Sequence, residues 1–278
     1  MTPPAPRGRP HQAAGIVGFL ALAVAISVTC TRIPTDPTLV FSLAVDSLPS
    51  PSVVAGDTLR DTNGVAAPLT GRAYNIQNQV LTNVHVQFLS LSPDQLTVSA
   101  KNFAIGTASG DSIVRVIADA NGLQSLPFNV PVVLKPQNLI FADSDSISTQ
   151  ALSLTNPDSD VSVPLNVLLI HQPDTLGADS VTRSYIVHYQ ITYPASAATG
   201  QGLPSDTTLP AYLVEADGQP SRTDTTDGNG MGTRTVQFSV AQFQPKSVDS
   251  IVVMTTAMYR DSVIAGSPRR FVIHYTAP

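Results

Sequence analysis

Residues 84–99 read VHVQFLSLSPDQLTVS, and this stretch decides the fold class. Val84, Val86 and Phe88 alternate with polar neighbours, so one face of the segment is apolar and the other is polar. A period of two predicts a half-buried β-strand, because successive side chains in a strand point to opposite faces of the sheet. The SPD at 92–94 then predicts a turn before the next strand.

The same pattern continues toward the C-terminal side of this stretch. The segment LPFNVPV at 126–132 places four apolar residues on one predicted face: Leu126, Phe128, Val130 and Val132. Turn-forming Ser, Gly, Asp and Asn separate the apolar alternations, and no helical period of useful length interrupts them. Short strands at this spacing are typical of a sandwich or a barrel.

Six further segments of the same kind follow: 163–171, 184–193, 209–216, 233–240, 250–259 and 270–276. The second of them, SYIVHYQITY, has four residues that face one way: Tyr185, Val187, Tyr189 and Ile191. Six candidate strands come close to the seven of a small Ig-type sandwich.

The composition points the same way. Hydrophobic residues make up 42% of the 278, which is enough for packed cores, and the length suits about two domains. Charged residues make up only 13%, and Glu215 is the sole glutamate among them. Good helix formers are therefore scarce, while 23 prolines and 17 glycines favour turns. The composition predicts an all-β protein.

Two stretches resemble known bacterial modules. Residues 86–99 followed by 109–122 resemble bacterial Ig-like domains of group 2, in which a strand ending in an aromatic leads to SSxPxxxTVS and a later strand precedes a glycine hairpin. Those repeats often carry Trp on the first strand, and Phe88 takes that core position in this chain, which has no tryptophan. Residues 215–238, EADGQPSRTDTTDGNGMGTRTVQF, resemble invasin-type Ig-like modules, with Arg234 where small residues are usual.

The resemblance implies a fold and a domain organisation. We expect an all-β protein with two tandem Ig-like β-sandwich domains, the first at residues 40–136 and the second at 161–278. The intervening 137–160 is rich in Asp, Ser and Thr and is expected to be a linker or edge segment. Modules of this kind imply no enzymatic activity.

The N-terminus has the layout of a secretory signal. Residues 1–12 carry two arginines and no acid, and residues 13–28 are an uninterrupted run of apolar and small side chains. The alternative is a membrane-spanning helix, but crossing a bilayer takes about 20 apolar residues and this run is shorter. A polar, turn-rich flank follows the run, as at a cleavage site.

The only cysteine of the chain, Cys30, lies just after this apolar run. ISVTC at 26–30 resembles the lipobox of bacterial lipoproteins, with Ser27 and Thr29 where Leu and Gly or Ala are usual. The resemblance implies a signal peptide at residues 1–29, cleavage before the cysteine, a lipid on Cys30 and a tether over residues 30–39. Two alternatives stay open: cleavage after Ala25 with release of a soluble protein, and an incidental free thiol.

The sequence offers little for metal or catalytic chemistry. DTTDGNG, residues 224–230, does not fit an EF-hand, because Asn229 and Val236 stand where that loop needs Gly and Glu. A looser calcium site is an alternative to solvated turn aspartates, with these candidate ligands: Asp143, Asp145, Asp158, Asp160 and Asp227. No G-x-S-x-G or S-x-x-K occurs, and HExxH is impossible with one glutamate. We therefore expect no catalytic residues, no cofactor and no metal.

Two further features restrict the partners. His188-Tyr189 and His274-Tyr275 recur as a pair, which predicts either one sheet face carrying both histidines in a site or an ordinary polar outer face. The net charge is −5 and only Arg269 and Arg270 form an adjacent basic pair, so we expect no nucleic-acid partner, because phosphate binding needs a clustered basic face.

Together these observations predict an exported, lipid-anchored, non-enzymatic protein of the bacterial envelope. It would act outside the cytoplasm as an adhesion, structural or protein-interaction scaffold, with the membrane as one partner through Cys30 and a protein or envelope polymer as another. The alternative is a small-ligand or glycan-binding lipoprotein that serves an uptake or degradative system. Flat faces favour the scaffold, while a concave pocket with converging polar groups favours the ligand binder. A hydrolase would need two carboxylates or a Ser-His pair in one cleft.

Overall fold

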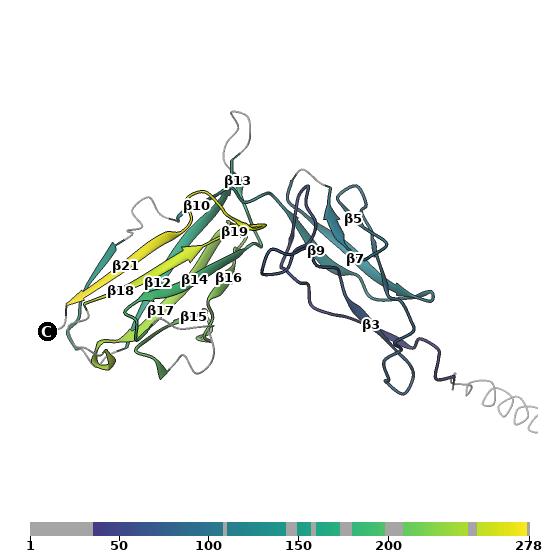
Figure 1. The fold of residues 1–278 in the computed structure, drawn as a ribbon, viewed down its shortest axis with the longest axis horizontal. Coiled ribbons are helices and arrows are strands. Elements are labelled where there is room, and N and C mark those ends of the chain that lie inside the picture. The colour runs from purple at the N-terminus through teal and green to yellow at the C-terminus, as the bar shows by residue number, and fades with distance from the viewer. Residues whose placement is uncertain are drawn as a thin grey trace, which may run out of the picture.

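A computed structural model describes residues 36–107, 110–142, 149–156, 160–172, 180–197, 208–243 and 249–276. In these residues the regular structure is β-strand, with a short 3-10 turn at Val240–Gln242 (Figure 1). The predicted all-β fold is confirmed. The predicted signal peptide and Cys30 lie outside the described residues. Within the described ranges no helix has both the length and the apolar character needed to cross a membrane.

The N-terminal half, residues 36–135, packs one larger sheet against two strand pairs. The larger sheet has the order β2-β9-β7-β4, with β8 added to β7, and the pairs are β1-β3 and β5-β6. The strands are β1 (Ser42–Val45), β2 (Val53–Val54), β3 (Gly71–Tyr74), β4 (Gln87–Ser90), β5 (Leu96–Val98), β6 (Ala104–Gly106), β7 (Ser112–Ala120), β8 (Leu123–Gln124) and β9 (Phe128–Val133).

The alternation predicted for this half is confirmed at β4 and fails at one residue before β9. Val86 and Phe88 are buried, while the residues between and beside them are exposed. Leu126, by contrast, is 88% exposed and does not join the core. Leu126 lies between β8 and β9, where Ser125 still donates its backbone N–H to the carbonyl oxygen of Ala118 and Phe128 pairs with Val116. The segment therefore carries one residue more than β7 opposite it, and this extra residue breaks the period of two.

The C-terminal half, residues 136–276, contains two five-stranded sheets. One has the order β10-β12-β17-β15, with β13 on β12, and the other has the order β11-β21-β18-β14-β16. The strands are β10 (Asn138–Phe141), β11 (Thr149–Ser153), β12 (Asp160–His171), β13 (Ser180–Val181), β14 (Ile186–Tyr193), β15 (Ala211–Val214), β16 (Thr223–Thr225), β17 (Met231–Ser239), β18 (Ser250–Thr256), β19 (Met258–Tyr259), β20 (Ser262–Val263) and β21 (Arg269–Thr276).

All six predicted segments of this half contain a strand: β12, β14, β15, β17, β18 and β21. The short strands β10, β11, β13, β16 and β20 carry too few apolar positions to show a period. Two of them lie in the 137–160 segment, where β10 forms the edge of one sheet and β11 the edge of the other. Leu139 of β10 is fully buried, so this segment contributes to the core of the C-terminal half.

Both halves open in the same way. The first strand of each half pairs antiparallel inside one sheet, β1 with β3 and β10 with β12. The chain then crosses to the other sheet, where the second strand pairs in parallel with the last strand of that half, β2 with β9 and β11 with β21. The N-terminal segment of each half therefore contributes one strand to each of two sheets and so connects them.

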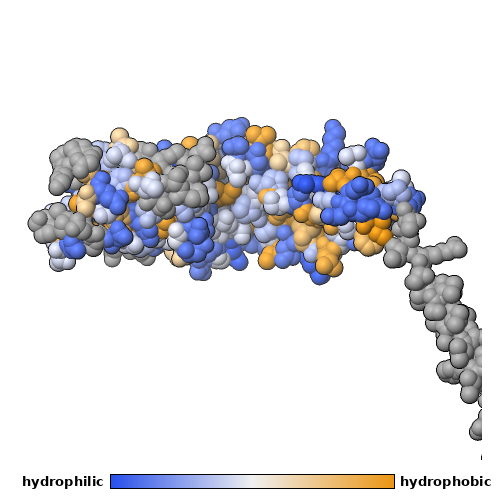
Figure 2. Space-filling model, turned by 90° about the horizontal axis from the view of Figure 1, so that it is seen from below, coloured by the Kyte–Doolittle hydropathy of each residue, from blue (hydrophilic) through white to orange (hydrophobic). Residues whose placement is uncertain are grey.

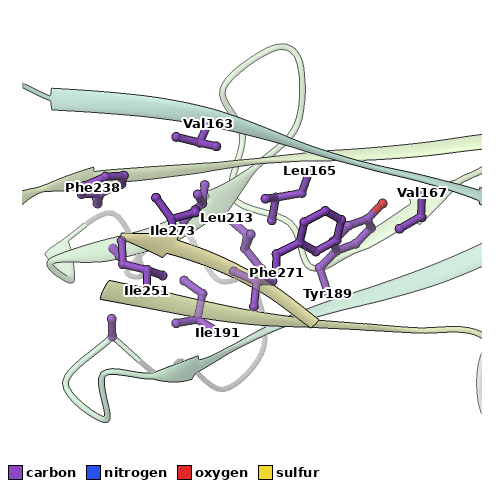
Figure 3. Close-up of a cluster of buried hydrophobic side chains, with 14 of the residues drawn as sticks. Val163, Leu165, Val167, Tyr189, Ile191, Leu213, Phe238, Ile251, Phe271 and Ile273 are labelled. Atoms are coloured by element: carbon purple, nitrogen blue, oxygen red, sulfur yellow. The ribbon is translucent and has the colours of Figure 1, made fainter. Parts of the chain in front are cut away.

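Each half has its own cluster of buried apolar side chains. The first cluster runs from Val53 to Val132 and the second from Leu139 to Tyr275, with no residue shared between them. In the second cluster, side chains from both sheets point into the space between the sheets (Figure 3). Removing apolar surface from water contributes about 25 cal/mol per Å², and this contribution holds the two sheets together.

Candidate functional site: the junction between the two halves

The two halves meet end to end, and the β19–β20 hairpin lies at the junction (Figure 1). The turn of this hairpin contacts the loop at residues 61–64 of the N-terminal half. Gly64 has φ +81°, and a Cβ at that position would lie 2.5 Å from the carbonyl oxygen of Arg260. Glycine is therefore required here, both for the backbone conformation and for the close approach of the two chain segments.

A buried carboxylate connects the two halves. Asp57 follows β2 and is only 6% exposed. Its Oδ1 accepts hydrogen bonds from the backbone N–H of Thr58 at 2.8 Å and from Nη2 of Arg60 at 3.1 Å. Its Oδ2 accepts from Nε of Arg60 at 3.0 Å and from Nε of Arg260 at 3.1 Å. Arg60 belongs to the same half, while Arg260 comes from the other half.

The charge of Asp57 is fixed by these donors. Burial alone would raise the pKa of Asp57, but the hydrogen bonds from Arg60 and Arg260, with further ones from Thr58 and Tyr259, outweigh it and hold the pKa well below its usual range. The carboxylate therefore stays ionised at any physiological pH, and both of its oxygens are occupied by donors. Such a group stabilises a junction and does not act as a general base.

Aromatic and polar contacts surround this ion pair. The ring of Tyr259 has Nζ of Lys135 at 5.1 Å and the guanidinium of Arg260 at 5.2 Å from its centroid. The Tyr185 hydroxyl donates to the carbonyl oxygen of Met258 at 2.7 Å, and burial raises the pKa of this tyrosine. The hairpin that carries Arg260 is thereby held against the body of the C-terminal half.

Two more bonds cross the junction. The Ser52 hydroxyl donates to the carbonyl oxygen of Ser184 at 2.7 Å. Arg183 forms an ion pair with Asp111, with 2.9 Å between Nε and Oδ2. Arg183 is about half exposed, so this pair is worth little alone. Three separate points of attachment nevertheless restrict rotation of one half against the other.

A cavity of about 410 Å³ lies at the junction. Its lining comes from both halves and includes Asp57, Arg60 and Asn63 on one side and His188 and Tyr259 on the other. Burial lowers the pKa of His188, so the neutral imidazole predominates at neutral pH. The cavity is concave and polar groups converge on it, although its main charges already neutralise one another.

The predicted histidine pair shares a sheet face but not a site. His188 is paired with Thr256 of β18, and His274 is paired with Ser250 of the same strand. Both histidines therefore lie on the outward face, six residues apart along β18, or about 20 Å. That separation is too large for a common ligand, so the polar outer face is the correct interpretation.

Two of the five candidate calcium ligands, Asp160 and Asp227, lie in the described residues. Oδ1 of Asp227 accepts from the backbone N–H of Asn229 at 2.8 Å and of Met231 at 2.9 Å, which fixes its own turn. Asp160 is exposed at the start of β12. The other three, Asp143, Asp145 and Asp158, lie outside the described residues. Among the residues that are described, no three His, Cys, Asp or Glu side chains group to hold a metal.

Arg234 occupies an inward-facing position of β17, where the invasin-type modules that this segment resembles usually carry small residues. It is 6% exposed and pairs with Glu215 at 3.0 Å and with Asp224 at 3.0 Å. It also donates to the carbonyl oxygen of Thr223. Because β17 and β16 belong to different sheets, this buried arginine joins the two sheets of the C-terminal half.

The junction residues were not found from the sequence. Asp57 and Arg260 are 203 residues apart, and neither stands in a motif. The available signal was the TLRDTNG stretch at 58–64, in which a turn-forming Asn-Gly follows two charges, but such turns are common on surfaces.

No protein-family model matches the chain, and no curated protein matches it. Solved structures with some likeness include the adhesin InvE of Yersinia pseudotuberculosis, at 13% identity and TM-score 0.32, where the likeness covers 84% of this chain and 58% of the adhesin. Domains 4 and 5 of the S-layer protein SbsC give 13% identity and TM-score 0.28, covering 86% of this chain and 99% of that one. These likenesses are distant.

Proposed function

We propose that the protein is an exported, lipid-anchored, non-enzymatic Ig-like protein of the bacterial cell envelope that acts as a stiff scaffold for adhesion or for other protein contacts. Its two Ig-like domains would be residues 40–136 and residues 161–278, with the 137–160 segment between them supplying an edge strand to each sheet of the second domain. Lipid on Cys30 would hold it at the membrane, outside the cytoplasm.

The observation that carries this proposal is the sharing of Asp57 between Arg60 and Arg260. A buried carboxylate that binds an arginine from each half stabilises one relative orientation of the halves, since losing one partner leaves a buried charge unpaired. A scaffold that presents a binding face at a fixed distance from a membrane needs this stiffness. Flexible tandem domains, by contrast, present that face over a wide volume.

Stiffness is tested by the distance between the halves. Nitroxide labels on Ile113→Cys and Gln190→Cys, in a Cys30→Ala background, place one probe on each half. We expect pulsed electron spin resonance to give one narrow distance distribution. Arg260→Ala should broaden it, whereas Arg72→Ala, which removes an ion pair inside the N-terminal half only, should not. A broad distribution in the parent chain would refute the stiff scaffold.

The anchor is tested separately at its sulfur. Intact-mass analysis of protein from the membrane fraction should show an acyl increment on the wild type, and Cys30→Ala should lose both the increment and the membrane retention. The same mass in both forms, apart from the substitution, would show that Cys30 carries no lipid.

The cavity at the junction supports a second candidate, a small-ligand or glycan-binding lipoprotein. Tyr259 presents an aromatic ring there, and Asn63 and Asp61 offer hydrogen-bonding groups beside it. If this candidate is correct, envelope oligosaccharides should shift the NMR signals of the cavity residues, and Tyr259→Ala should abolish the shifts. No shift with any oligosaccharide tested would leave the scaffold as the better account.

A further inference from the structure

An exposed apolar surface lies at the free end of the N-terminal half. We call it the apolar end and define it by Leu39, Phe41, Leu123 and Leu126. Leu126 is 88% exposed, Phe41 is 60% exposed and Leu39 is 49% exposed. A groove of about 450 Å³ runs between the β1 segment and the 123–128 segment and places these two pieces of chain side by side.

The apolar end is distant from the junction. Figure 1 places β3, and with it the paired strand β1, at the end of the molecule opposite the C-terminal half. Figure 2 shows hydrophobic surface gathered at this same end. The C-terminal half therefore does not cover the apolar end. Leaving a leucine and a phenylalanine side chain exposed to water next to each other costs free energy, because their apolar surface is not buried.

The chemistry of the surface restricts what can cover it. The residues that line the groove are Phe41, Ser42, Leu43, Val45, Leu123, Gln124, Ser125, Leu126, Pro127 and Phe128, and none of these is ionisable. A bilayer surface accepts such a group without desolvating a charge, and flanking hydroxyl and amide groups can remain at the headgroup level.

The position of the surface in the chain then selects the bilayer. Asp36, the first described residue, follows Cys30 by six residues, so the two cannot be more than about 20 Å apart. Leu39 and Phe41 come within the next five residues. A lipid on Cys30 would therefore hold the apolar end next to the membrane at a high effective concentration.

We propose that the apolar end is a membrane-contact surface that inserts Leu126 and Phe41 into the outer part of the bilayer. This inference rests on the proposed anchoring and extends it: the anchor sets the distance, and the apolar end sets the orientation. With both in place the long axis of the protein points away from the membrane and presents the C-terminal half outward.

The absence of tryptophan from the chain makes a direct test possible. Full-length protein carrying Leu126→Trp is purified from membranes and reconstituted into vesicles of phosphatidylethanolamine and phosphatidylglycerol with brominated acyl chains. Because docked apolar side chains lie about 5–10 Å into the interface, bromine should reduce the emission about twofold or more. The matched control is Ile113→Trp, at a position that is 69% exposed on the same half but away from the apolar end, and its emission should not change.

A second variant measures the contribution of a neighbour. Phe41→Ser in the Leu126→Trp background should weaken insertion about tenfold, since one large apolar side chain contributes about that factor to partitioning, and quenching should fall accordingly. Ile113→Ser should leave quenching unchanged. Both substituted side chains are exposed, so neither variant is expected to disturb the fold.

The outcomes separate this inference from the anchor. Vesicle flotation and intact mass on the same samples report whether the chain is anchored and acylated. Anchored Leu126→Trp protein whose tryptophan emission ignores the bromine overturns the membrane-contact surface and leaves the anchor intact. Emission that shifts with protein concentration and not with bromine shows that a second copy covers the surface, and this also overturns the proposal. Protein that does not float defeats the anchor and the inference together.

Discussion

The two halves begin with the same order of strand pairings, antiparallel and then parallel with the last strand, but their cores contain different side chains. The N-terminal half closes around valine, alanine and leucine, with Phe88 and Phe128 as an edge-to-face pair. The C-terminal half closes around an aromatic cluster in which the ring centroids of Phe238, Phe243 and Tyr275 lie within 6.3 Å of one another. One strand plan thus accommodates two interiors, and the larger side chains go with two complete five-stranded sheets.

The difference predicts an order of unfolding. The C-terminal cluster buries more and larger side chains than the N-terminal one, so the C-terminal half should be the more stable of the two. The junction opposes separate unfolding, because opening either half exposes Asp57 or removes Arg260. Hydrogen exchange followed by mass spectrometry reads each half separately and can therefore test both statements.

The largest effect should come from the aromatic cluster of Phe238, Phe243 and Tyr275. Phe238→Ala removes a ring that contacts two others and should cost about 4 kcal/mol, while Phe88→Ala in the smaller core should cost about 3 kcal/mol. We expect Phe238→Ala to make the C-terminal half exchange first and so to reverse the order of the two halves. An unchanged order after this substitution would contradict the comparison.

The second largest effect should come from the buried Arg234. Arg234→Ala leaves Asp224 without its ion pair between the sheets and should destabilise the C-terminal half by about 3 kcal/mol. Denaturant unfolding with Arg72→Ala as the control measures this, since Arg72 also pairs with an aspartate but is 57% exposed. Equal losses in the two variants would show that Arg234 only covers the edge of the sandwich.

Acid should weaken the coupling between the two halves, and the loss of stability should be smaller than in the two substitutions above. The pKa of Asp57 is lowered in the folded protein, so its contribution of about 2 kcal/mol is present above the unfolded pKa of about 3.9 and is lost as the pH falls from there toward the folded pKa. Below about pH 4 the two halves should therefore exchange more independently. Asp57→Asn should show that independence already at neutral pH, and its coupling should no longer change with acid in this range.

Gly64 should give the smallest effect. Gly64→Ala places a methyl group against the Arg260 carbonyl at a positive φ, and we expect about 1 kcal/mol of destabilisation. The loss should appear as faster exchange at the junction, with both cores retained. Gly122→Ala is the matched control, because Gly122 has φ +85° and a Cβ there would have no atom within 4 Å. The difference between the two variants gives the cost of the contact without the cost of the positive φ.

The strands were predictable where the alternation was long. β12, β14, β17 and β21 each carry enough apolar positions at period two to be located within a few residues. Leu126 departs from the predicted pattern because the chain between β8 and β9 carries one residue more than β7 opposite it, which breaks the period of two before Phe128. β13, β16 and β20 contain two or three residues each, which is too short for any period to appear.

The junction was not predictable, for a physical reason. An ion pair between Asp57 and Arg260 depends on how two folded halves dock, and charge and spacing in the sequence carry no record of that docking. Arg234 was visible as an arginine in the inward phase of TRTVQF, but its partners Glu215 and Asp224 become neighbours only when the two sheets stack.

The parallel pairing that closes each half has a mechanical consequence. When tension pulls the second and the last strand of a half in opposite directions, these two parallel strands slide along each other, so their backbone hydrogen bonds are loaded together and not one after another. β11 runs beside β21 over five residue pairs, whereas β2 runs beside β9 over two. Under the proposed anchoring, tension between the membrane and a bound partner should make the N-terminal half yield first and lengthen, which would spare the C-terminal half and whatever it holds.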